Sequence, residues 1–145
     1  MEKINILSID WTDHKCAISK YFTVKEALWL PKWKVLGEPN NFVKVNIHTL
    51  AAKMDYVREI LGESVIVTSW FRPHGYNSLK SIGGATSSIH INGGADDFVC
   101  KSLKPAEVQK RLLPFLDLLN IRMENCGKGR THIDLGREIN RYFLP

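Results

Sequence analysis

The stretch Ser88-Ile89-His90-Ile91-Asn92-Gly93-Gly94-Ala95-Asp96-Asp97 pairs a histidine with a carboxylate seven residues later. Two ligands on one face of a helix would lie three or four residues apart, so this spacing does not suit a helix. It suits a loop that turns through the two glycines and leads into a strand. We therefore expect His90 and Asp97 to approach each other from the two sides of such a loop.

A second histidine motif, Thr131-His132-Ile133-Asp134, lies near the C-terminus. Two histidines and one aspartate make a three-ligand zinc site, and such a site leaves the fourth tetrahedral position open for water. An open position is typical of catalytic zinc rather than of structural zinc. The sequence thus indicates a candidate zinc site formed by His90, Asp97 and His132.

The length of 145 residues favours one domain that covers residues 1–145, with residues 1–20 as a candidate N-terminal arm. Its 44% hydrophobic content can supply one core. No apolar run reaches the roughly 18 residues of a membrane span, so we expect no membrane partner. The N-terminus lacks a basic segment followed by an apolar stretch, so we expect synthesis in the cytoplasm without a secretory signal.

The net charge of +5 favours an anionic partner such as nucleic acid or a cell-wall polymer. The lysines and arginines are dispersed, however, and no block of five occurs, so we expect no nucleic-acid partner. The three cysteines show no Cys-x-x-Cys spacing. This pattern argues against a cysteine-ligated zinc.

The pattern from Asn41 to Leu61 predicts an amphipathic helix. Its apolar stripe consists of Val43, Ile47, Leu50, Met54, Val57 and Leu61. Gly62 can end the helix because glycine tolerates the left-handed conformation. His48 lies beside the stripe and is interpreted as a surface histidine. Lys3 to Ile9 suits a short strand or an ordered arm.

Two further helices have recognisable starts. Thr23 and Glu26 form a capping box, and the helix that they open should end before Pro31. Pro105 suits the first position of the other helix, and Pro114 predicts a kink or break within it.

Four segments predict strands. Ser64 to Thr68 is a β-branched run that suggests a strand buried on both faces. Asp97 to Cys100 should re-enter the sheet. Ile121 to Asn125 and Thr131 to Leu135 indicate a hairpin that turns at Gly127-Lys128-Gly129.

With these motifs in place, the chain resembles the zinc DD-peptidases of the hedgehog/DD-peptidase superfamily. The family pattern S-x-H-x-x-G-x-A-x-D is matched by Ser88, His90, Gly93, Ala95 and Asp97. Upstream, the family's serine, arginine, asparagine and glycine pair resemble Ser69, Arg72, Asn77 and Gly83-Gly84. Downstream, the family's His-x-Asp-x-Gly ending is similar to residues 132–136. The likeness covers about residues 20–137.

The resemblance implies an α+β fold with a small antiparallel sheet and flanking helices. It also implies a Zn²⁺ cofactor and the hydrolysis of peptide bonds in peptidoglycan at the bacterial cell wall. D-Ala-D-Ala carboxypeptidase, D,D-endopeptidase and L-Ala-D-Glu peptidase activities are all compatible with it. The chain is most similar in character to bacteriophage members, either lysis enzymes (endolysins) or virion-borne wall-degrading proteins. The oligomeric state stays open.

One departure from the family pattern concerns the general base. The superfamily's catalytic acid often lies three to six residues before the last zinc histidine, and positions 126–129 here hold no carboxylate. Asp134 shares a strand face with His132, so we favour it as the base or as a residue that orients a zinc histidine. Glu124, on the neighbouring strand of the hairpin, is its main rival.

Other site residues follow from the same motifs. Arg72 would bind the substrate carboxylate or the tetrahedral oxyanion through its planar fork of donors. Ser88 is also assigned to the substrate-binding part of the site. We expect its side chain to order the loop by hydrogen bonds to the backbone rather than to act as a nucleophile. Trp70 and Tyr76 suit either a substrate contact or core packing.

Two other classes of function stay open. The chain could be a catalytically inactive, zinc-stabilised structural or wall-binding module of a phage virion, and the missing upstream carboxylate favours this alternative. Nucleic-acid binding rests on the net charge alone.

Overall fold

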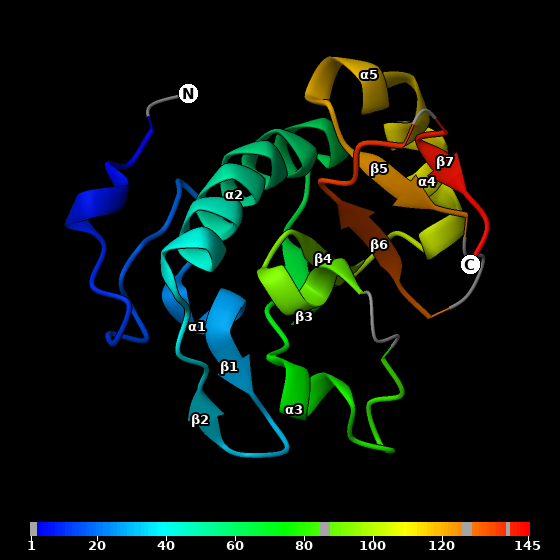
Figure 1. Ribbon diagram of the computed structural model, residues 1–145. Coiled ribbons are helices and arrows are strands. Elements are labelled where there is room, and N and C mark those ends of the chain that lie inside the picture. The colour runs from blue at the N-terminus through cyan, green and yellow to red at the C-terminus, as the bar shows by residue number, and fades with distance from the viewer. Residues whose placement is uncertain (1–2, 85–87, 126–128, 139) are drawn as a thin grey trace.

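The computed structural model describes residues 3–84, 88–125, 129–138 and 140–145 (Figure 1). Its helices are η1 (Ile6–Ser8), α1 (Val24–Leu28), α2 (Asn41–Leu61), α3 (His74–Asn77), η2 (Ile89–Asn92), α4 (Pro105–Leu112), η3 (Leu113–Phe115) and α5 (Leu116–Leu119). Its strands are β1 (Trp29–Leu30), β2 (Val35–Leu36), β3 (Val65–Ser69), β4 (Ala95–Cys100), β5 (Arg122–Glu124), β6 (Thr131–Asp134) and β7 (Tyr142–Phe143). None of the described helices combines the length and apolar character that crossing a bilayer requires.

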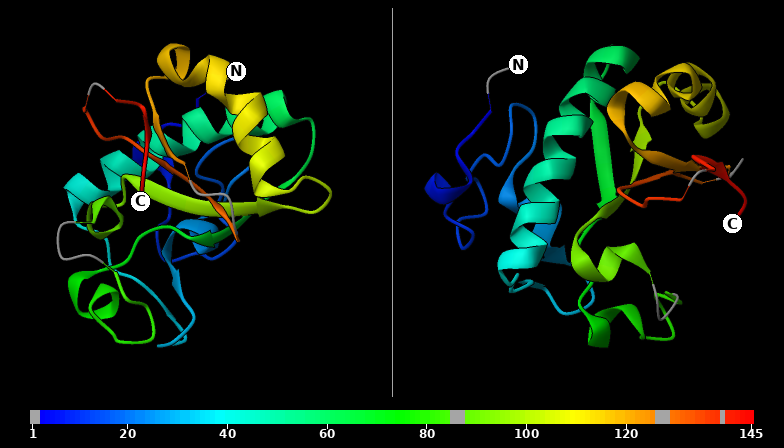
Figure 2. Two further views of the ribbon diagram at one scale, coloured as in Figure 1. Left: turned by 90° about the vertical axis from the view of Figure 1, so that its right-hand side faces the viewer. Right: turned by 45° about the horizontal axis from the view of Figure 1, so that its top comes forward.

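The fold is α+β, as predicted, and its main sheet has five strands in the order β3-β4-β6-β5-β7. All neighbours in this sheet are antiparallel except β5 and β7, which are parallel. Helix α2 lies along one side of the sheet, beside α4 and α5 (Figures 1 and 2). Phe98, Met123 and Ile133 are buried in one core with the apolar residues of α2 and α4. Asp97 and His132 are the strand neighbours of Phe98 and Ile133, and successive side chains of a strand point to opposite faces. The candidate ligands therefore lie on the other face of β4 and β6.

Helix α2 has the bounds that its hydrophobic period predicts. All six residues of the predicted stripe are buried, and each such side chain contributes roughly 1.5–3 kcal/mol relative to an exposed one. The Asn40 side chain accepts a hydrogen bond from the Val43 N–H at 2.9 Å and caps the first turn. Gly62 ends the helix in the left-handed conformation with φ 71°.

The prediction that the strand after α2 is buried on both faces is wrong. β3 stands at the edge of the sheet, and exposed residues alternate along it with buried or half-buried ones. Ile66 is 49% exposed. An edge strand has one neighbour, and here only one of its faces is covered, so the β-branched composition alone could not reveal its burial.

The N-terminal segment is tied to α2. Of the two alternatives for residues 3–9, a short strand or an ordered arm, the strand is not formed, and the segment contains the 3-10 helix η1. His48 is half-buried, with its Nε2 atom 2.6 Å from the Ile4 carbonyl oxygen. The interpretation of His48 as a plain surface residue is therefore wrong, because the arm packs over this part of α2.

The remaining predicted elements form close to their expected bounds. Thr23 and Glu26 form the capping box of α1, which ends before Pro31. Pro114 breaks the helix that begins at Pro105, and η3 separates α4 from α5. β5 and β6 pair as the antiparallel arms of the predicted hairpin. The predicted turn at Gly127 and Lys128 lies outside the described residues.

Candidate metal centre

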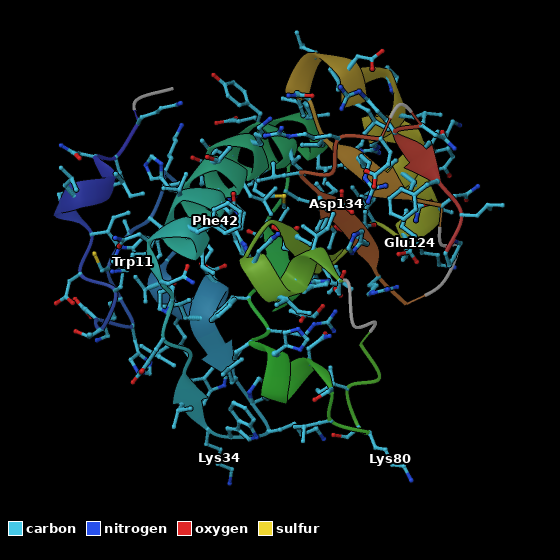
Figure 3. The ribbon with its side chains drawn as sticks, viewed as in Figure 1. Trp11, Lys34, Phe42, Lys80, Glu124 and Asp134 are labelled. Carbon is cyan, nitrogen blue, oxygen red and sulfur yellow. The ribbon has the colours of Figure 1, made fainter. Side chains whose placement is uncertain are left out.

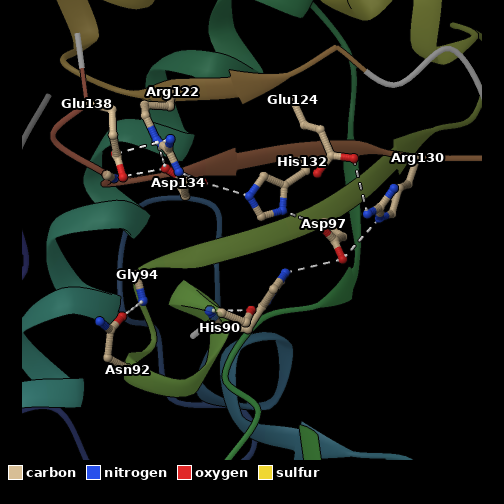
Figure 4. A network of polar contacts seen from close by, with 12 residues as sticks. His90, Asn92, Gly94, Asp97, Arg122, Glu124, Arg130, His132, Asp134 and Glu138 are labelled. Atoms are coloured by element: carbon tan, nitrogen blue, oxygen red, sulfur yellow. Dashed lines mark hydrogen bonds and ion pairs between the residues drawn. The ribbon is translucent and has the colours of Figure 1, made fainter. Parts of the chain in front are cut away.

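Three side chains from distant parts of the chain meet on the face of the sheet opposite the core residues Phe98 and Ile133 (Figure 4). His90 comes from η2, Asp97 from β4 and His132 from β6, and all three are buried. One ligand atom from each lies within 4.8 Å of the other two. The pairing of Asp97 with His132 in the β4–β6 register explains part of this meeting, since directly opposed residues share a face.

The turn before β4 brings His90 to the strand. The Ser88 hydroxyl accepts a hydrogen bond from the His90 N–H at 3.2 Å and caps η2, which is the loop-ordering role predicted for this serine. Gly93 ends η2 with φ 79°. A Cβ atom at Gly93 would lie 2.8 Å from the Cγ1 atom of Ile47, so only glycine fits this turn against α2.

The ring of His90 is held by a backbone carbonyl. Its Nδ1 atom lies 2.7 Å from the Trp70 carbonyl oxygen, so Nδ1 carries a hydrogen and donates it. The Trp70 indole N–H in turn donates to the Gly93 carbonyl at 3.0 Å. His90 Nε2 is thereby directed at the Oδ2 atom of Asp97, 3.4 Å away. Trp70 is buried, so it supports the site from the core.

The ring of His132 is held by two carboxylates. Its Nδ1 atom lies 2.9 Å from Asp97 Oδ1, and its Nε2 atom lies 2.8 Å from Asp134 Oδ2. Asp134 also accepts two hydrogen bonds from the Arg122 guanidinium, at 2.7 and 2.9 Å, and one from the Gly136 N–H at 2.8 Å. Metal-bound histidines typically donate their remote nitrogen to a carboxylate or a carbonyl, and both histidines here have such a partner.

Strand β7 packs against this network through the ring of Phe143. The Arg122 guanidinium lies 4.2 Å from the ring centre of Phe143, in cation–π geometry. The same Phe143 ring meets His132 edge-on, with 6.0 Å between the ring centres. The C-terminal strand thus packs against both His132 and the arginine that fixes Asp134.

The charges of the cluster are strongly coupled. Burial alone would lower the pKa of His132, but hydrogen bonds and attraction from Asp134 and Asp97 outweigh it and raise this pKa to about 9. Burial would likewise raise the pKa of Asp97, but hydrogen bonds from His132 and His90 hold it well below its usual range. Without a bound metal, His132 therefore carries a proton at neutral pH and Asp97 carries a negative charge.

Zinc uptake at about pH 7 is expected to release about one proton, because a histidine must be neutral to bind a metal. His132 holds that proton up to a pKa of about 9, whereas Asp97 has none to give. The release should therefore decline as the pH rises through about 9. Isothermal titration calorimetry in buffers of different ionisation enthalpy measures the number. Zinc binding without proton release at about pH 7 would contradict this assignment of His132.

Asp96, the carboxylate next to Asp97, is not part of the cluster. Successive side chains of a strand point to opposite faces, and Asp96 lies on the core face together with Phe98. It is fully buried, and neither of its oxygens has a hydrogen-bond partner among the described residues. Burial raises the pKa of Asp96 well above its usual range, and repulsion from Asp97 adds to this effect. Burial therefore favours the uncharged form of the Asp96 carboxyl group.

Two carboxylates near the cluster, Glu124 on β5 and Asp134 on β6, differ in their surroundings (Figure 3). The Asp134 side chain is 2% exposed and is held by Arg122 and His132. The Glu124 side chain is 12% exposed. The β5–β6 register, continued by one residue, places Glu124 opposite His132 and on the same face.

Arg130, like Arg122, is a residue near the cluster that the sequence reasoning missed. Its Nε atom lies 3.2 Å from Asp97 Oδ2, and its Nη2 atom lies 3.7 Å from Glu124 Oε1. The sequence did contain an indication of this position. Side chains two residues apart on a strand point to the same face, so residue 130 shares a face with His132 and Asp134. Positions 126–128, where the family pattern expects the catalytic acid, lie outside the described residues.

Arg72 also lies beside the centre. Its backbone N–H donates to the His90 carbonyl at 2.9 Å. Burial lowers the pKa of Arg72, while attraction from Asp97 opposes this change. The side chain borders a hollow of about 240 Å³, together with Ser69 and Tyr76. Tyr76 is buried and accepts a hydrogen bond from the Lys32 N–H at 3.1 Å, so it takes part in packing.

Asp134→Asn is expected to weaken zinc binding by about 10- to 100-fold, because the amide would no longer act as a charged partner for His132 Nε2. Competition with a chromophoric chelator measures the affinity. Asp117→Asn is the matched control, since Asp117 pairs with Arg141 at 2.8 Å but its side chain is 95% exposed. Unchanged zinc affinity with a complete loss of cleavage would instead identify Asp134 as the base.

Comparison with protein-family models assigns most of this chain to a known family. The model described as Peptidase M15 matches residues 20–134, a range that contains His90, Asp97, His132 and Asp134. The comparisons with curated proteins and with solved structures found no match.

Proposed function

Because the chain belongs to the Peptidase M15 family of metallopeptidases, we propose that it is a zinc-dependent hydrolase of peptide bonds in bacterial peptidoglycan. The observation that carries the proposal is the meeting of two imidazoles and one carboxylate within 4.8 Å. The remote nitrogens of both histidines are already engaged, by the Trp70 carbonyl and by Asp134. His90 Nε2, His132 Nδ1 and the Asp97 carboxylate are thus the donors for the metal.

This donor set fits zinc. Two imidazole nitrogens and one carboxylate are ligands that zinc accepts, and three protein ligands leave a fourth position open. A bound zinc ion would lower the pKa of a water molecule toward neutrality and polarise the carbonyl of the scissile amide. The buried position of the three ligands keeps bulk water from competing for them.

We assign the role of general base to Glu124 and the orienting role to Asp134. Both Asp134 oxygens already accept hydrogen bonds, from Arg122, His132 and Gly136. Glu124 lies on the cluster face opposite His132, with Arg130 3.7 Å away. Glu124 would take a proton from the attacking water as the carbon–oxygen bond forms, and would pass it to the leaving amine as the carbon–nitrogen bond breaks.

Arg72 supplies the positive charge for the substrate. Arg72 is half-buried and interacts electrostatically with Asp97, and it borders a hollow of about 240 Å³. A guanidinium binds a carboxylate through two parallel hydrogen bonds. D-Ala-D-Ala and the L-Ala-D-Glu bond each present a carboxylate on the carbon next to the leaving amine, so Arg72 suits both substrates.

The site of action that we propose is the bacterial cell wall, with a role as a phage lysis enzyme or as a virion-borne wall-degrading protein. The second candidate function is an inactive, zinc-stabilised wall-binding module. It is favoured by the missing carboxylate at positions 126–129. The position of Glu124 opposite His132 favours the enzyme instead.

Digestion of purified peptidoglycan, followed by mass spectrometry of the released muropeptides, tests the proposal. We expect new peptide fragments whose masses identify the bond that is cut. A chelator should abolish their release, and added zinc should restore it. If the protein binds one zinc tightly but releases no fragments, the wall-binding module is the better description.

A further inference from the structure

We propose that Arg130 is a positioning residue that holds the Glu124 carboxylate against the metal centre and acts on hydrolysis through Glu124. This inference rests on the proposed function. It concerns a residue that lies outside the motifs of the metal ligands, two positions before His132.

The Arg130 guanidinium spans two carboxylates. Its Nε atom is 3.2 Å from Asp97 Oδ2, and its Nη2 atom is 3.7 Å from Glu124 Oε1 (Figure 4). Because the guanidinium is planar and rigid, its two donors keep a fixed separation. The position of the Glu124 carboxylate is thereby set relative to Asp97, which is itself placed by the two histidines.

The surroundings of Glu124 explain why it needs such a partner. The Asp97 and Glu124 carboxyl groups both lie against the Arg130 guanidinium, and two carboxylates brought close together repel each other. The positive charge of Arg130 lies between the two carboxylates and compensates this repulsion. The Arg130 side chain is 38% exposed, so solvent reaches the pair that it forms with Glu124. Without Arg130, Glu124 would turn away from Asp97 toward that solvent.

The inference predicts which kinetic constant changes. A misplaced base lowers the rate of the chemical step, whereas substrate binding continues through other residues such as Arg72. Arg130→Gln should lower kcat by about 10- to 100-fold, the effect of misplacing a catalytic group by about 1 Å, with KM within about threefold of wild type. Arg130→Lys should recover part of the loss, because lysine keeps the charge but not the two-pronged geometry.

A double-mutant cycle tests whether Arg130 acts through Glu124. In the Glu124→Gln background, Arg130→Gln should lower kcat by less than about threefold, because the carboxylate that it positions is gone. Zinc affinity of Arg130→Gln, measured by chelator competition, should stay within about threefold of wild type. Arg111→Gln is the matched control, since Arg111 pairs with Glu107 at 3.1 Å on α4.

Several results would overturn the inference. Arg130→Gln could lower kcat equally in both backgrounds, or it could weaken zinc binding as much as it lowers cleavage, which would place its effect on Asp97. A structure of the zinc-loaded Arg130→Gln variant gives a readout that needs no activity. Glu124 should be displaced from its wild-type position, and an unmoved Glu124 carboxylate would reject the inference even if the wild-type protein cleaves nothing.

Discussion

Asp97→Asn is expected to abolish tight zinc binding and to lower kcat/KM for peptide cleavage by about 1,000-fold or more, since removing a ligand should exceed the 10- to 100-fold effect of losing an orienting partner. Asp97 faces His132 Nδ1 at 2.9 Å and His90 Nε2 at 3.4 Å, so it is the central member of the cluster. An amide has nearly the same shape, but it brings no negative charge to the cation. Zinc content after dialysis and chelator competition measure the binding.

Asp96→Asn is the matched control for this substitution. It makes the same chemical change one residue earlier, in a carboxyl group on the core face of β4, where burial raises its pKa. We expect Asp96→Asn to keep wild-type zinc affinity. Zinc should also raise the thermal unfolding temperature of this control and of the wild-type protein but not that of Asp97→Asn, because a ligand stabilises only a form that binds it. Equal zinc affinity in Asp97→Asn and wild type would refute the metal centre.

Glu124→Gln is expected to lower kcat by about 100- to 10,000-fold while zinc stays bound, because general base catalysis typically contributes that factor. Glutamine preserves the size of the side chain and its place opposite His132, but it cannot accept the proton of the attacking water. Zinc content and kcat should be measured on the same preparation, so that loss of the metal is separated from loss of the base.

Glu107→Gln is the control, since Glu107 is also paired with an arginine, on the surface of α4. It should leave both zinc content and kcat at wild-type values. The contrary outcome is near wild-type cleavage in Glu124→Gln together with complete loss in zinc-loaded Asp134→Asn. That combination would return the role of base to Asp134, as the spacing of the His-x-Asp motif first suggested.

The elements that the sequence predicted best are those set by neighbours along the chain. The apolar stripe of α2 repeats every three or four residues, and the left-handed Gly62 directly follows the last residue of the helix. The break at Pro114 follows from the missing N–H and the ring of proline itself. The meeting of His90, Asp97 and His132 could be predicted because the motif spacing matched a known family pattern.

What the sequence could not provide depends on partners far along the chain. The exposure of Ile66 depends on which face of β3 other parts of the chain cover. The orienting geometry of Asp134 follows from Arg122 on the neighbouring strand. The contacts of Arg130 need the β4–β6 pairing to bring Asp97 within reach.

The sequence by itself therefore determined the long helix, the helix ends and the identity of the three candidate ligands. Periodicity, capping and the backbone geometry of proline and glycine act over a few residues, so they can be identified from short stretches of sequence. Tertiary structure alone decided the surroundings of three carboxyl groups: Asp134 holds the His132 ring, Glu124 lies beside Arg130, and Asp96 is buried in the core. Strand register and sheet order set these environments, and they depend on pairing between segments that can lie tens of residues apart.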